Sequence, residues 1–305
     1  MTAQWRATYV VRTGIRSVAE REGADVTPAH VHAHPSGGAD GILWIVAVPF
    51  AVAVISYLAG MVIQGRRGRP WSPLRGWCWM LGCGVALIGM LGPLVSPSFD
   101  GFVGHMTAHL LVGMLAPLLL VLAAPMTLAL RTLDRDPARR LSRLLRSAPA
   151  RLVTAPAVAA ALNIGSMWAL YFTPLWELAE VPFFHLVLML HFLIVGYLFT
   201  VSIVGVDPNP HRASFTVRAI VLMLALAAHS VLAKLIYAEP PPGVSRGDGE
   251  VGAQVMFYGG DLIDVALMVV LCAEWYRVSG RRLTSSTPKG RREARGSGDR
   301  VGTLG

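Results

Sequence analysis

The chain has 305 residues, of which 54% are hydrophobic and only 15% are charged, and its formal net charge is +9 at pH 7. Soluble domains carry roughly a quarter charged residues, so this composition excludes a soluble globular enzyme and a nucleic-acid-binding domain. The three cysteines contain no CxxC spacing, which excludes a disulfide framework and a zinc finger.

Seven apolar stretches of about 20 residues follow one another, and each is long enough to cross a bilayer. Membrane-spanning backbone must satisfy its own hydrogen bonds, so these stretches are expected to be helices. The sequence predicts an all-α polytopic membrane protein with seven transmembrane helices. The stretches are residues 41–63, 75–95, 102–128, 152–172, 182–206, 219–237 and 254–275.

Polar segments flank this predicted seven-helix domain, residues 41–276. Residues 1–40 form a polar tail without an apolar core for a signal peptide, and we expect this tail to be disordered. Residues 277–305 are basic and rich in Gly and Ser, and we expect them to be disordered as well. The chain therefore divides into a tail, a membrane domain and a second tail.

The basic residues predict the orientation of the spans. Of 27 Lys and Arg, 21 lie in the loops 64–75, 131–151 and 207–218 and in the C-terminal tail, which all share one side if there are seven spans. The positive-inside rule then places the C-terminus in the cytoplasm and the N-terminus outside. The charge of +9 is thus interpreted as a topology signal rather than as a nucleic-acid footprint.

Ionisable side chains inside a membrane are costly, and by default they indicate function. Seven of them fall within about 15 Å of the outer surface, counted at 1.5 Å per helical residue. These candidates are His105, His109, His185, His191, His229, Asp261 and Asp264.

The spacing and chemistry of these side chains suggest a metal site. His105 and His109 are four residues apart and share a helix face, as do Asp261 and Asp264, which are three apart. Met106 lies at a similar depth, and imidazole together with thioether suits copper, especially Cu(I), better than magnesium or calcium. We therefore expect the seven residues and Met106 to form a copper site. The plainer interpretation is that these histidines only hydrogen-bond to neighbouring helices.

A second histidine pattern lies in the N-terminal tail. His30, His32 and His34 alternate, and alternate residues of an extended chain point the same way, so three imidazoles could chelate one metal ion. The alternative is a disordered tail in which the histidines occur by chance.

Several stretches resemble the caa3-type cytochrome c oxidase assembly factor family (CtaG). The most specific is SFDGFVGHMTAHLLVGMLAPLLLVLAAP at residues 98–125, with its SF, HMxxH and repeated AP pattern. ALYFTPLWELAEVPFFHLVLMLHFLIVGYLF, VGVDPNPHR, the histidine of ALAAHSVLAKLIY and YGGDLIDVALMVVLCAEWYR resemble later parts of the family pattern. The resemblance covers residues 41–277, and Asp261 and Asp264 depart from the apolar segment that many members have after the Gly-Gly pair.

The resemblance implies an integral protein of the bacterial plasma membrane that helps to mature a haem–copper cytochrome c oxidase. Its implied partners are oxidase subunits, and its implied role is copper handling without catalysis. The same histidines leave two alternatives open, a bis-histidine haem protein for electron transfer and a proton-coupled transporter with His and Asp relays. The sequence contains no recognisable nucleophile–base pair, phosphate loop or nucleotide site, so we do not predict an enzyme.

Overall fold

The computed structural model describes residues 36–96, 101–179 and 181–285, and all regular structure within these ranges is helical. This confirms the all-α class for the described part of the chain. The chain divides into two units, residues 1–37 and 38–305. Of the two tails that we expect to be disordered, only residues 36–40 and 277–285 are described. The stretch with His30, His32 and His34 lies outside the described residues. The helices are α1 (Ser36–Arg66), α2 (Pro73–Val95), α3 (Gly101–Leu110), the π-helical η2 (Leu111–Leu115), α4 (Ala116–Leu122), α5 (Pro125–Thr132), α6 (Arg135–Leu145), α7 (Ala148–Val153), α8 (Pro156–Phe172), α9 (Leu175–Ala179), α10 (Pro182–Ile203), α11 (Phe215–Ala238) and α12 (Arg246–Ser285).

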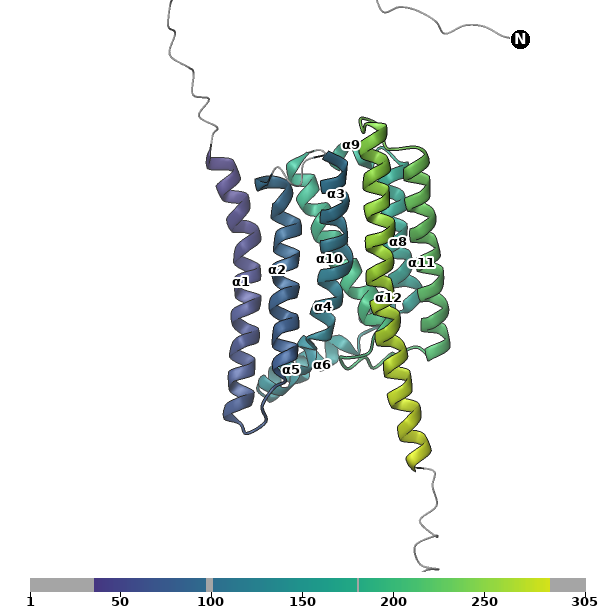
Figure 1. Ribbon diagram of the computed structural model, residues 1–305. Coiled ribbons are helices and arrows are strands. Elements are labelled where there is room, and N and C mark those ends of the chain that lie inside the picture. The colour runs from purple at the N-terminus through teal and green to yellow at the C-terminus, as the bar shows by residue number, and fades with distance from the viewer. Residues whose placement is uncertain (1–35, 97–100, 180, 286–305) are drawn as a thin grey trace, which may run out of the picture. The chain divides into compact units, whose positions relative to one another are not determined.

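Six helices in the described part of the chain are long and apolar enough to cross a membrane. They are α1, α2, the continuous α3–η2–α4, α10, α11 and α12. The remaining expected span forms α8, an apolar helix of 17 residues that is shorter than the other six. Figure 1 shows α8 running alongside α10 and α11, against which it packs. Seven crossings and the orientation of the termini therefore remain predictions.

The largest differences from the helix boundaries expected from the apolar pattern lie in the third span and in the last helix. The third span ends at Leu122 rather than at residue 128, because Ala124 adopts a left-handed conformation with φ of 55° and Pro125 starts a new helix. Proline lacks a backbone N–H and suits the first turn of a helix. The last helix is longer than the predicted 254–275 and continues past residue 276, because polar residues extend it at both ends. Hydropathy marks only the apolar middle of such a helix.

The α3–η2–α4 helix lies at the centre of the membrane domain. The most apolar part of this span is 61% buried inside the protein, whereas the most apolar part of α1 is only 17% buried. The central helix packs against α2, α10 and α12, and α11 packs against α8 and α12. Gly196 allows α10 to approach closely, because a Cβ at this position would collide with the carbonyl oxygen of Gly113 in η2. The candidate histidines on α3 are therefore surrounded by other helices.

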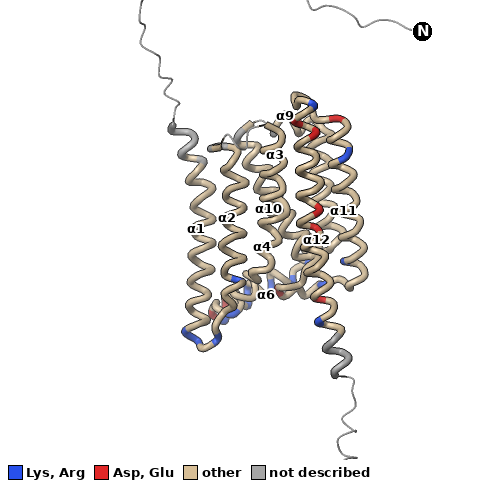
Figure 2. Tube along the Cα trace, in the orientation of Figure 1, with Lys and Arg blue, Asp and Glu red and all other residues tan. Residues whose placement is uncertain are grey.

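Basic residues gather at one end of the domain, where α5 and α6 lie, as Figure 2 shows. We call this the basic end, and the other, where α9 lies, the opposite end. At the basic end the buried carboxylate of Asp207, in the α10–α11 loop, accepts hydrogen bonds from the backbone N–H groups of Met126 (3.1 Å) and Thr127 (2.8 Å). A side chain that accepts from the first free N–H groups caps a helix. Asp207 thus ties the loop to the start of α5.

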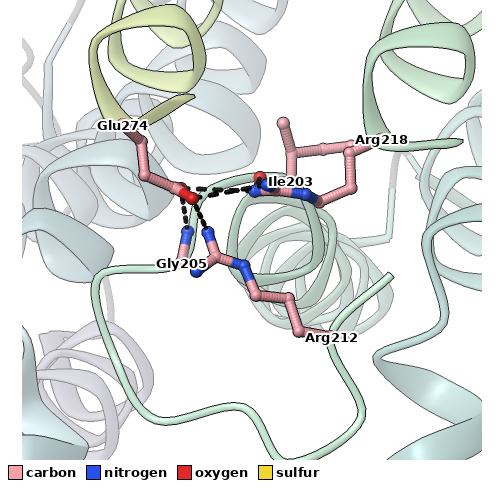
Figure 3. A network of polar contacts seen from close by, with 5 residues as sticks. All are labelled: Ile203, Gly205, Arg212, Arg218 and Glu274. Carbon is pink, nitrogen blue, oxygen red and sulfur yellow. Dashed lines mark hydrogen bonds and ion pairs between the residues drawn. The ribbon is translucent and has the colours of Figure 1, made fainter. Parts of the chain in front are cut away.

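A second polar network at the basic end centres on Glu274 of α12 (Figure 3). Its carboxylate accepts hydrogen bonds from the guanidinium of Arg218, at 3.2 and 3.3 Å, and from the backbone N–H of Gly205, at 3.0 Å. Arg212 forms a further ion pair with Glu274. Arg218 also donates to the carbonyl oxygen of Ile203 at 2.6 Å. This network joins the end of α10, the following loop and α11 to α12.

Candidate functional site

The position of His105 and His109 depends on how α3 begins. Gly101 has φ of 74°, in the left-handed region that favours glycine, and the next backbone N–H, of Phe102, donates to a carboxylate oxygen of Asp248 at 2.7 Å. Asp248 belongs to the first turn of α12. This capping interaction therefore fixes the start of α3 against α12 at the opposite end.

The first group of candidate residues surrounds His105, and we call it the His105 site: His105, Met106, Tyr171, Trp176 and His185. The Nε2 atom of His105 lies 3.2 Å from the Tyr171 hydroxyl, which also lies 3.7 Å from the Met106 sulfur. The ring centre of His105 lies 5.7 Å from that of His185 and 5.1 Å from that of Trp176. Two imidazoles, one from α3 and one from α10, and a thioether thus lie close together among aromatic side chains.

The second group lines an internal cavity of about 30 Å³. We call it the His109 cavity. A cavity needs roughly 10–15 Å³ to hold a water molecule, so this one has room for a water or a single ion. Its polar and sulfur-containing lining residues are His109, Met114, Asn163, Met167, Thr200, His229 and Asp264.

The histidines of this cavity have no hydrogen-bond partners. His109 is 1% exposed and His229 is 2% exposed, and neither ring nitrogen of either side chain forms a hydrogen bond within the described structure. Buried polar atoms are almost always paired, and an unpaired one costs about 1–3 kcal/mol. His109 and His229 therefore bring to this cavity ring nitrogens that could bind a water molecule or an ion.

Two glycines make room for these rings. A Cβ at Gly260 of α12 would lie 3.0 Å from Nδ1 of His229 and closer still to another ring atom. A Cβ at Gly113 would lie 3.4 Å from the His109 ring. The π-helical segment that contains Gly113 begins two residues after His109, and such segments are frequent at functional sites.

The structure brings the predicted residues together at two places rather than one. His105, Met106 and His185 form part of the His105 site, whereas His109, His229 and Asp264 line the His109 cavity. The separation arises because α3 presents successive turns to different neighbours. His105 contacts α8, α9 and the start of α10, whereas His109 contacts the middle of α10 and shares its cavity with residues of α8, α11 and α12.

Two predicted residues fall outside both places. His191 contacts Phe192 and lines neither site, and its buried Nε2 forms no hydrogen bond with a described residue. Asp261 is half-buried on α12 and does not line the cavity. Within the described residues, no three His, Cys, Asp or Glu side chains are arranged to hold one metal ion. Any metal here would need other ligands as well.

Several residues that line these sites were not among the residues predicted from the sequence. Tyr171 and Trp176 complete the His105 site, and Met114 and Met167 line the His109 cavity. Asn163 also lines the His109 cavity, and its polarity in an apolar span is the one signal that the sequence gives for this position. The methionines gave no signal, because thioethers are common in apolar helices.

Comparisons with known proteins agree with the motifs. Among curated proteins, an uncharacterized protein of Mycobacterium leprae is 29% identical over 249 residues, which are 74% of this chain and 38% of that protein. An uncharacterized protein of Mycobacterium bovis is 36% identical over 188 residues, 59% of this chain and 28% of that protein. The chain thus spans less than half the length of these relatives. No solved structure matches it.

The family model for cytochrome c oxidase caa3 assembly factors (Caa3_CtaG) matches residues 55–278, which is most of the chain. The match includes α2 to α11, most of α12, and both groups of histidines. It confirms the resemblance seen in the motifs, and this chain belongs to the cytochrome c oxidase caa3 assembly factor family.

Proposed function

We propose that this protein supports the assembly of a haem–copper cytochrome c oxidase by binding copper as cargo within the membrane. The observation that carries the proposal is the pair of buried histidines, His109 and His229, which line a cavity of about 30 Å³ and whose four ring nitrogens form no hydrogen bond with any described residue. Because the family assists the assembly of cytochrome c oxidase, the bound copper would be delivered to oxidase subunits.

The chemistry of the lining residues favours copper over harder ions. Met114 and Met167 line the same cavity as the two imidazoles. Imidazole and thioether suit copper, whereas magnesium and calcium prefer oxygen ligands. The described residues contain no group of three His, Cys, Asp or Glu side chains that could hold one metal ion. A site of two histidines and a methionine does not need such a group.

The two groups of histidines suggest an order of binding. His105 and His185 are partly exposed near the opposite end, whereas His109 and His229 are buried deeper along the domain. The positive-inside rule places the basic end in the cytoplasm, and α8 would then complete seven crossings with the C-terminus inside. Copper would enter from the outside at the His105 site and move one helical turn inwards to the His109 cavity.

The structure gives less support to the two alternatives. Pockets for small molecules and cofactors measure roughly 300–1,000 Å³, so the His109 cavity is far too small for a haem between its histidines. A proton path would need polar groups from the cavity to the basic end. Instead, the side chains of Phe199, Leu222 and Leu271 pack there in an apolar cluster.

Complementation in cells tests the proposal. A bacterium that lacks its own family member and contains no active oxidase of this type would receive the wild-type chain or the double variant His109→Ala/His229→Ala. We expect membranes with the double variant to show little oxidase activity and little of the oxidase optical signature. His191→Ala is the matched control, because this half-buried intramembrane histidine lines neither site. Normal oxidase activity with the double variant would contradict the proposed role.

A further inference from the structure

A larger cavity lies at the basic end. It has a volume of about 460 Å³ and lies between the start of α2 and the latter part of α12. The loop that follows α10 contributes Val204, Gly205 and Val206 to its wall. None of its lining residues belongs to the His105 site or the His109 cavity.

The charged groups around this cavity are predominantly positive. Arg75 and Arg277 line it, and within the described residues neither forms a salt bridge. Arg75 instead lies over the ring of Trp71 at 4.8 Å. Glu274 is the acidic residue in the lining, but its carboxylate already binds two arginines and a backbone N–H (Figure 3). The cavity therefore presents cationic groups without a matching anion.

The remaining wall is apolar and opens towards surface that faces the membrane. Leu74 is 71% exposed and Val269 is 61% exposed, and both line the cavity. Leu81 of α2 and Val265 of α12, one or two turns further along the same helices, are also exposed. A ligand with an anionic group and long apolar chains would match both parts of this surface.

We infer that this cavity binds the phosphate-bearing headgroup of an anionic phospholipid, with its acyl chains along α2 and α12. Basic pockets between transmembrane helices are known to bind such headgroups on the cytoplasmic side. The basic end is the cytoplasmic end by the positive-inside rule. Arg75, Arg277 and the Ser72 hydroxyl hold the phosphate, and the Glu274 network holds the loop that forms the cavity wall.

Native mass spectrometry of the full chain, purified in detergent, tests this inference. The probes are phosphatidylglycerol, phosphatidylcholine and inorganic phosphate. We expect one phosphatidylglycerol to be retained in preference to phosphatidylcholine, and excess inorganic phosphate not to displace it. Each arginine near a membrane surface contributes about fivefold in affinity, so Arg75→Gln/Arg277→Gln should bind about 25-fold more weakly. Arg139→Gln/Arg140→Gln removes the same charge from exposed positions of α6 and should bind normally.

Three results would overturn the inference. The first is equal loss of the lipid in both double variants, which would indicate general charge attraction. The second is equal retention of phosphatidylcholine. The third is displacement by inorganic phosphate, which would indicate a site for a free anion. If the Arg75→Gln/Arg277→Gln variant fails to fold, the single variant Arg277→Gln at an exposed position should still bind about fivefold more weakly, and unchanged binding would refute the assignment.

Discussion

Glu274→Gln should destabilise the membrane domain, because it removes the negative charge that two arginines share at the basic end. The Arg218 side chain is 6% exposed and that of Glu274 is 19% exposed. Loss of one partner of a buried pair costs about 3–5 kcal/mol, since the other charge stays buried without compensation. Arg212 is partly exposed, so we expect the lower end of this range, about 3 kcal/mol. For a chain of this size, this corresponds to a decrease in Tm of about 6 °C.

Thermal unfolding of the purified protein in detergent measures this effect. Glu250→Gln is the matched control, because Glu250 pairs with an exposed Arg246 four residues away, and such pairs contribute about 0.5 kcal/mol or less. Replacing Arg218 by Met in the Glu274→Gln background should recover part of the loss, since no uncompensated buried charge then remains. Equal Tm values for Glu274→Gln and Glu250→Gln would refute the structural role given to the network.

Two further predictions concern single side chains. Gly260→Ala should lower stability by about 1–3 kcal/mol and weaken copper binding, because the added Cβ collides with the His229 ring. Gly165→Ala is the control, because the space around this residue is open, and it should be neutral or slightly stabilising in thermal unfolding. Asp207→Ala should cost about 1–2 kcal/mol in the same assay through loss of the α5 cap, whereas Asp134→Ala at the N-terminus of α6, where the side chain makes no capping hydrogen bond, should cost little. Equal effects within either pair would contradict the corresponding contact.

The sequence predicted the seven long apolar helices, but not all of their ends and not the short helices α5, α6, α7 and α9. Apolar stretches of bilayer length predicted the six long helices and α8, because hydropathy averages over about 20 residues. It could not predict the break at Ala124, where the backbone turns within a still apolar run. The partners of Glu274 were also not predictable, because Arg218 lies 56 residues away in sequence.

The candidate site was also only partly predictable, because some of its features depend on contacts between helices that are distant in sequence. The i, i+4 spacing correctly placed His105 and His109 on one helix, and their depth suggested a common function. Spacing along one chain does not give the rotation of neighbouring helices, and the separation of the histidines into two groups depends on that rotation. The same information decides that His229 faces the cavity and His191 does not.

Titration of the purified protein with Cu(I) against a chromogenic competitor measures whether copper binds in the His109 cavity. We expect His109→Ala/His229→Ala to bind about one copper ion fewer per chain than the wild type, and His191→Ala to bind as many as the wild type. Undiminished copper binding by the double variant, or equal loss in the His191→Ala control, would rule out the His109 cavity as the copper site.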